Sequence, residues 1–121
     1  MAKIKVTINI ENKTSQSIVS KKAIENIVLK VLESKKREGN FLVDVIVVGI
    51  QEIHTLNREY REIDKSTDVL SFPIHEKVKN DQNSPILLGD IVLCPEMAQD
   101  PVEKLIEHST LHLFGYHHKE D

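Results

Sequence analysis

The sequence predicts an α+β fold, a single domain of 121 residues with a mixed sheet of about four strands and helices packed on it. Residues 3–10 alternate apolar and polar side chains, which is typical of a half-buried strand. Residues 24–32 carry apolar side chains at helical spacing. Residues 67–73 and 86–94 are apolar runs that pair most simply as an antiparallel hairpin. A hairpin late in the chain indicates an α+β fold with a mixed sheet.

In the first half of the chain, the elements have recognisable start and stop signals. Ser17 or Ser20 can cap the first helix, and Gly39 is expected to end it. Residues 41–48 are almost uniformly apolar, so we expect a strand buried on both faces and helices on at least one side of the sheet. Residues 51–61 follow with near-helical spacing and predict a short helix.

In the second half, two residues constrain the hairpin. Pro73 confines the strand at residues 67–73 to an edge of the sheet or to the end of the strand. Residues 76–85 are polar and predict a loop. Gly89 indicates a bulge or a close backbone approach in the strand that follows. Cys94 is expected to be a small buried core residue and not a nucleophile.

Composition limits the location and the partners. The chain is 40% apolar and 29% charged, and no stretch resembles a membrane span or a signal peptide. We therefore expect a cytoplasmic protein without a membrane partner, and the single cysteine fits a reducing compartment. The net charge of −3 argues against a protein that coats nucleic acid by bulk electrostatics. None of these features defines an oligomeric state.

Four of the six histidines lie close to the end of the sequence: His108, His112, His117 and His118. Residues 103–113 have helical spacing, so the first two of these histidines stand at i and i+4 on one helical face. Gly115 can end that helix in a left-handed conformation. The turn would then bring His117 or His118 to the same ion.

Three imidazoles without a fourth protein ligand are typical of a catalytic zinc site, because the remaining position holds a water molecule of lowered pKa. Since Cys94 is the only cysteine, a closed cysteine-rich site is excluded. Zinc peptidases of the H-E-x-x-H type place a glutamate general base after the first histidine. Ser109 stands there instead, which disfavours peptide hydrolysis. RNA carries its own nucleophile, the 2′-hydroxyl, and needs less from a protein base.

Four stretches together point to one family. Residues 56–61, 67–73, 88–92 and 108–118 read LNREYR, TDVLSFP, LGDIV and HSTLHLFGYHH. In this order they resemble the bacterial YbeY proteins, which are zinc-dependent endoribonucleases of ribosomal RNA maturation. The resemblance implies a zincin-like fold in which residues 1–121 form one metal-dependent hydrolase domain. It also implies one Zn²⁺ per chain, held by the three ligands His108, His112 and His118.

The implied activity is single-strand-specific cleavage of ribosomal RNA at the 3′ end of 16S rRNA, with ribosomal subunit proteins as further candidate partners. Arg61 matches the arginine of the family's cleft, where a guanidinium would clamp the scissile phosphate and stabilise charge in the transition state. The alternative for Arg61 is a surface residue paired with Glu59 or Asp64.

Asp68, Ser71 and Asp90 also lie in the matching stretches, where they either face the groove or, as Asp68 could, cap a turn. Two departures from the family pattern stand beside the ligands. Ser109 replaces a glycine, and His117 replaces an aspartate, where it could either weaken the support of a ligand or compete as the third ligand. The second functional hypothesis is therefore a ribosome-assembly binding module with a mainly structural zinc and little catalysis.

Overall fold

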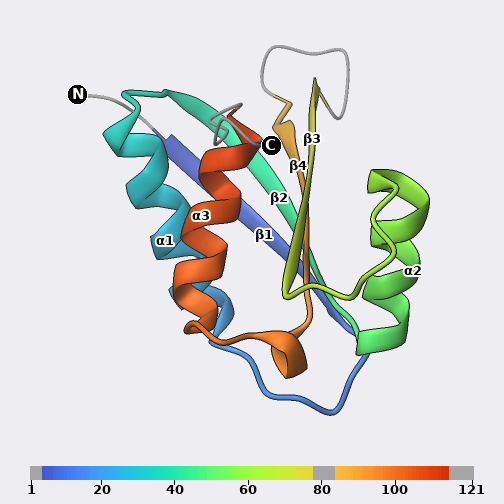
Figure 1. Ribbon diagram of the computed structural model, residues 1–121. Helices are drawn as coiled ribbons and strands as arrows, with labels where there is room; N and C mark the ends of the chain where they lie inside the picture. Colours follow the sequence, from blue (N-terminus) through green and yellow to red (C-terminus); the bar gives the residue numbers. More distant parts are fainter. Residues whose placement is uncertain (1–3, 78–83, 115–121) are drawn as a thin grey trace.

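The computed structural model describes residues 4–77 and 84–114 (Figure 1). Strands and helices alternate along the first half of the chain, a hairpin follows, and a helix comes last, which confirms the α+β prediction. The elements are β1 (Ile4–Asn12), α1 (Lys21–Ser34), β2 (Gly39–Val47), α2 (Ile50–Arg61), β3 (Val69–Lys77), β4 (Ile86–Leu93), a short 3-10 helix η1 (Pro95–Met97) and α3 (Val102–Leu113).

The four strands form one mixed sheet in the order β1-β2-β4-β3. Strands β1, β2 and β4 are parallel to one another, and β3 pairs with β4 in the antiparallel direction. The predicted hairpin of the late strands is confirmed. Strand β3 lies at an edge, where the missing N–H of Pro73 is tolerated as the sequence indicated.

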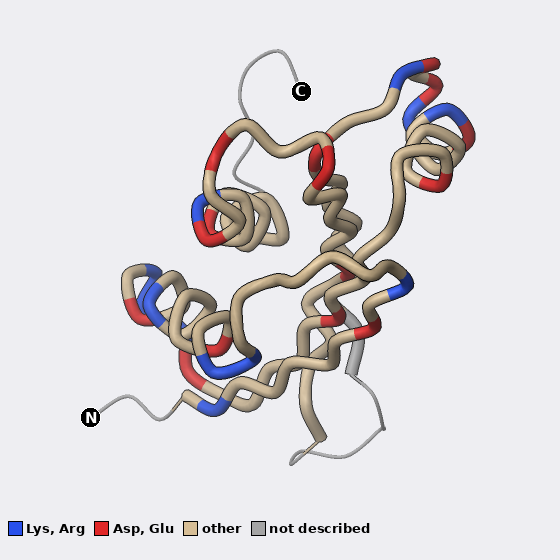
Figure 2. Tube along the Cα trace, turned by 90° about the horizontal axis from the view of Figure 1, so that it is seen from below, with Lys and Arg blue, Asp and Glu red and all other residues tan. Residues whose placement is uncertain are grey.

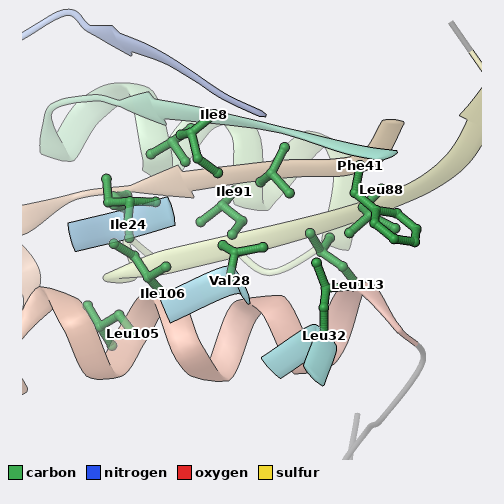
Figure 3. Close-up of a cluster of buried hydrophobic side chains, with 13 residues drawn as sticks. Ile8, Ile24, Val28, Leu32, Phe41, Leu88, Ile91, Leu105, Ile106 and Leu113 are labelled. Atoms are coloured by element: carbon green, nitrogen blue, oxygen red, sulfur yellow. The ribbon is translucent and has the colours of Figure 1, made fainter. Parts of the chain in front are cut away.

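Helices cover both faces of the sheet, and the main core lies on the face of α1 and α3 (Figures 1 and 2). Because side chains alternate along a strand, Ile91 and Leu93 of β4 join this core while Val92 between them packs on the side of α2. Figure 3 shows Val28 of α1, Ile91 of β4 and Ile106 of α3 among the side chains of the main core. Each fully buried aliphatic side chain contributes roughly 1.5–3 kcal/mol. Within the described residues, no helix is long and apolar enough to cross a bilayer.

Helix α1 begins as predicted and ends earlier than predicted. The Ser20 side chain accepts a hydrogen bond from the N–H of Ala23 at 3.1 Å and caps the helix. The helix ends at Ser34 because Lys36 adopts a left-handed conformation with φ of 54° and closes the last turn. The expectation that Gly39 ends the helix is wrong, since this glycine begins β2.

The expectation that residues 41–48 are buried on both faces is also wrong. Along β2 the burial alternates: Phe41, Val43 and Val45 are fully buried, whereas Leu42 and Asp44 between them are only partly buried. Helix α2 packs against β3 and leaves this part of the second face incompletely covered. The predicted loop at residues 76–85 is also shorter at its start, because β3 extends through Lys77.

Candidate active site

A cleft of about 780 Å³ lies between α3 and the edge strand β3. One wall is formed by α3, and the opposite wall by residues 67–71 and Pro73, which lead into β3 and form its first part. Arg61, the last residue of α2, also lines the cleft. Residues that are far apart in the sequence therefore meet in one hollow, beside β3, which is antiparallel to its neighbour β4.

His108 and His112 lie one helical turn apart on the side of α3 that lines this cleft. Their ring centroids are 4.4 Å apart and the rings are tilted by 50° to each other. Zinc binds imidazole nitrogens at about 2.0–2.1 Å, so two rings at this separation are within reach of a shared ion. In chemistry and spacing the pair fits two positions of an open zinc site.

The third predicted ligand, His118, and its alternative His117 lie outside the described residues. Within residues 4–77 and 84–114, no group of three or more histidine, cysteine, aspartate or glutamate side chains is arranged to hold a metal ion. The described part of the site thus supplies two candidate ligands, and the third remains a prediction.

Arg61 is held at the rim of the cleft by the edge strand. Its Nη2 donates a hydrogen bond to the carbonyl oxygen of Ser71 at 2.5 Å, and its guanidinium carbon lies 5.7 Å from the centre of the Phe72 ring. Asp64, one of the two partners considered for a purely structural Arg61, is bonded by His54 at 2.6 Å. The contacts to β3 therefore orient the guanidinium beside the cleft.

The fixed charges of the cleft are mainly negative. Its lining includes three carboxylates and two cationic side chains, namely Asp68, Asp100, Glu107, Arg61 and Lys104. A phosphodiester that entered this cleft would face more like charges than opposite ones. A bound cation between the histidines would reverse that balance.

The residues of the hairpin motif separate into two groups. Asp68 and Ser71 line the cleft. Asp90 lies outside it and pairs with Asp44 of the neighbouring strand. Burial foremost, and then the charge and hydrogen bond of Asp44, raise the pKa of the Asp90 carboxyl. Asp44 in turn accepts a hydrogen bond from Asn9 at 3.1 Å.

Several cleft residues were not anticipated from the sequence. Lys104 is one turn before His108, so helical spacing could have identified it. Asp100 precedes α3, where no pattern marked it. In the sequence, Ser109 stands out only as the residue in place of a glutamate base and of the family's glycine. It is 1% exposed, and its hydroxyl has no hydrogen-bond partner in the described part of the chain.

Fold and cleft together define a small α+β protein in which a histidine pair and an arginine face one groove, a combination suited to metal-assisted attack on a phosphate ester. Residues 9–121 match the family described as Endoribonuclease YbeY. The chain therefore belongs to the YbeY family, which confirms the resemblance of the four sequence stretches.

Individual relatives extend over most of the chain. It is 32% identical to the endoribonuclease YbeY of Lachnospira eligens, with 93% of this chain and 86% of the relative covered. It is 38% identical to that of Clostridioides difficile, with 88% and 76% covered. A solution structure of a Thermotoga maritima protein, 32% identical, superposes with a TM-score of 0.49 over 95% of this chain and 77% of that one.

Proposed function

We propose that this protein is a zinc-dependent endoribonuclease that cuts single-stranded RNA during ribosomal RNA maturation, at the 3′ end of 16S rRNA. Its fold would be zincin-like, with α3 as the metal-binding helix. His108, His112 and His118 would hold one Zn²⁺, and ribosomal RNA and ribosomal subunit proteins would be its partners in the cytoplasm. Family membership supports the activity class, since the relatives are named endoribonucleases.

The proposal rests mainly on one observation: side chains from α3 and from the end of α2 line the same cleft beside the edge strand β3. The neighbouring rings of His108 and His112 and the guanidinium of Arg61 line the same cleft. Arg61 is fixed by its bond to Ser71, so it can bind a phosphate oxygen without first being ordered. These are the groups that phosphodiester cleavage requires: ligands for a cation and a positioned anion binder.

The chain's own residues have separate roles in this mechanism. Zinc supplies a Lewis acid and a nucleophile that is active at neutral pH. His108 and His112 would keep that chemistry at the α3 wall. Arg61 would bind the scissile phosphate and stabilise the added charge in the transition state. Asp68 and Ser71 line the opposite wall, where they can contact the ribose or the attacking water.

The mainly negative lining supports metal dependence. Asp68, Asp100 and Glu107 would repel RNA from a metal-free cleft, most strongly at low ionic strength, because Asp100 and Glu107 are exposed and therefore screened by salt. The proposal therefore predicts weak RNA binding as well as no cleavage in metal-free protein.

The test compares metal-stripped and zinc-reloaded protein on an end-labelled single-stranded RNA and on the same sequence in a duplex. Wild type should cut only when reloaded, internally, and only the single strand. His112→Ala should lose zinc binding and cleavage while its circular dichroism spectrum stays that of the wild type. Cleavage that persists in zinc-free His112→Ala would refute the mechanism.

A second variant separates phosphate binding from metal binding. Arg61→Ala should bind zinc as the wild type does and cut RNA at least about a hundredfold more slowly, which is the usual loss when one charge-stabilising donor is removed. Arg58→Ala is the matched control, since Arg58 lies in the same last turn of α2 and does not line the cleft. Zinc-loaded protein that binds RNA without cutting it would favour the alternative function, a binding module with a structural zinc.

A further inference from the structure

The end of the histidine helix is held by a residue of the edge strand β3. His75 of β3 donates a hydrogen bond from Nε2 to the carbonyl oxygen of Leu113, the last residue of α3. The last four carbonyls of an α-helix have no partner within the helix. His75 therefore satisfies one of them across the gap between strand and helix.

The backbone of β3 is distorted at the point where His75 makes this contact. Pro73 pairs with Gly89 and Glu76 with Leu87, so two residues of β3 oppose one of β4. This two-against-one register is a β-bulge, a feature that redirects a side chain. His75 itself has φ of 58°, in the left-handed region that a non-glycine residue seldom adopts. The sheet accepts an unfavourable backbone geometry where the histidine meets α3.

A second contact holds the same helix end. Phe114, which follows α3, meets the His75 ring edge-on with centroids 6.3 Å apart. The guanidinium carbon of Arg37, beyond the end of α1, lies 5.3 Å from the centre of the Phe114 ring. The exit of α3 is thus fixed from β3 on one side and from the end of α1 on the other.

We propose that His75 is a positioning residue for the metal site. It anchors the carbonyl directly after His112 and so fixes the orientation of the last turn of α3 relative to His108. The inference rests on the proposed zinc site and assigns His75 no direct contact with metal or RNA.

The test uses two variants at one position. His75→Gly accepts the left-handed backbone, so it should fold, but it lacks the donor. His75→Gln retains an N–H donor on a side chain of similar reach. The readouts are the zinc dissociation constant from chelator competition and the visible spectrum of the Co²⁺-substituted protein, which reports ligand geometry. Ile53→Val, a core change on the face of α2, is the control for general destabilisation.

We expect His75→Gly to weaken zinc binding by about tenfold or more, as loss of a supporting residue behind a metal ligand usually does, and to change the Co²⁺ spectrum. His75→Gln should restore both towards wild type, and Ile53→Val should leave both unchanged. The inference is overturned if His75→Gly binds zinc as tightly as wild type and gives the same Co²⁺ spectrum. It is also overturned if His75→Gln loses as much zinc affinity as His75→Gly does.

The same measurements separate this inference from the proposed function. A wild-type protein that binds zinc but never cuts RNA refutes the proposed function. The His75 variants can still be compared in that case, because their readouts are the zinc affinity and the Co²⁺ spectrum. A wild-type protein that binds no zinc refutes both.

Discussion

Ser109 and Thr110 are adjacent buried residues of α3 whose hydroxyl groups differ in hydrogen bonding. The Thr110 hydroxyl donates to the carbonyl of Ile106 at 2.7 Å, whereas the Ser109 hydroxyl has no partner in the described part of the chain. A buried polar group without a partner costs about 1–3 kcal/mol. The unpartnered Ser109 hydroxyl therefore lowers the stability of the helix that carries the histidines.

The two hydroxyls make a matched pair of variants. Ser109→Ala should raise the free energy of unfolding by about 1 kcal/mol, because it removes an unsatisfied group and favours the helix. Thr110→Ala should lower it, because it removes a satisfied hydroxyl and a buried methyl group. Urea denaturation of both variants measures the difference. Destabilisation by Ser109→Ala would mean that the hydroxyl is bonded in solution.

Asp90 predicts a pH dependence of stability. Its pKa is raised above the ordinary 3.8 in the folded state, mainly by burial and then by Asp44. Between the ordinary and the raised pKa the folded protein binds more protons than the unfolded chain, so stability falls as pH rises through this window. The loss persists at neutral pH, where the folded protein holds a charged Asp90 beside Asp44.

Asp90→Asn tests this dependence. The amide does not titrate and can donate to the Asp44 carboxylate, so the variant should be more stable than wild type at pH 7 by about 0.5–1.5 kcal/mol. The advantage should shrink as pH falls below the titration of Asp90. Urea midpoints measured from pH 3 to pH 7 give the pH dependence of stability for wild type and for Asp90→Asn. A constant difference between the two proteins over this range would contradict the prediction.

At the scale of elements, Gly89 determines how closely β4, β3 and α3 approach. A Cβ atom at this position would lie 2.3 Å from the carbonyl oxygen of Phe72 and 2.8 Å from a Leu113 methyl carbon. The sequence predicted a bulge or a close approach at this glycine, and the close approach is confirmed. The contact also connects the sheet to the end of α3, next to His112.

Gly89→Ala should therefore lower the free energy of unfolding by more than about 2 kcal/mol, from backbone strain together with the clash. Gly39→Ala is the matched control. Gly39 also has a positive φ, 131° compared with 153° for Gly89. An added Cβ at Gly39 would meet only the Phe41 ring, at an ordinary contact distance of 3.5 Å. If urea denaturation gives equal losses for the two variants, backbone strain alone accounts for both.

The sequence predicted most elements because their signals are local. Alternation identified β1, helical spacing identified α1 and α3, and Pro73 restricted β3 to an edge of the sheet or placed the proline at the strand's end. The early end of α1 was missed because Lys36, and not a glycine, takes the left-handed conformation. At the site, helical spacing placed His108 and His112 on one face. The contact of His75 with α3 joins residues far apart in sequence and has no local signal.

At the scale of the whole molecule, the net charge of −3 and the mainly negative cleft predict few phosphate contacts. For single strands the logarithm of the affinity falls with the logarithm of salt concentration by about 0.7 per neutralised phosphate. With Arg61 and Lys104 as the cationic side chains of the cleft, we expect a slope of about −1.4. Fluorescence anisotropy with a 2′-O-methyl RNA, which lacks the internal nucleophile, measures the slope. A much steeper value would indicate a separate basic RNA-binding surface.

Strand β4 lies inside the sheet, between β2 and β3, although it is the last of the described strands in sequence order. During translation β2 and β3 emerge first and cannot pair with each other, because the strand between them is still to be synthesised. Until β4 and then α3 leave the ribosome, the nascent chain exposes unpaired strand edges and the apolar side chains of α1. Chains that stop before residue 86 should therefore remain unfolded and bind chaperones, and any truncated variant intended to fold must retain α3.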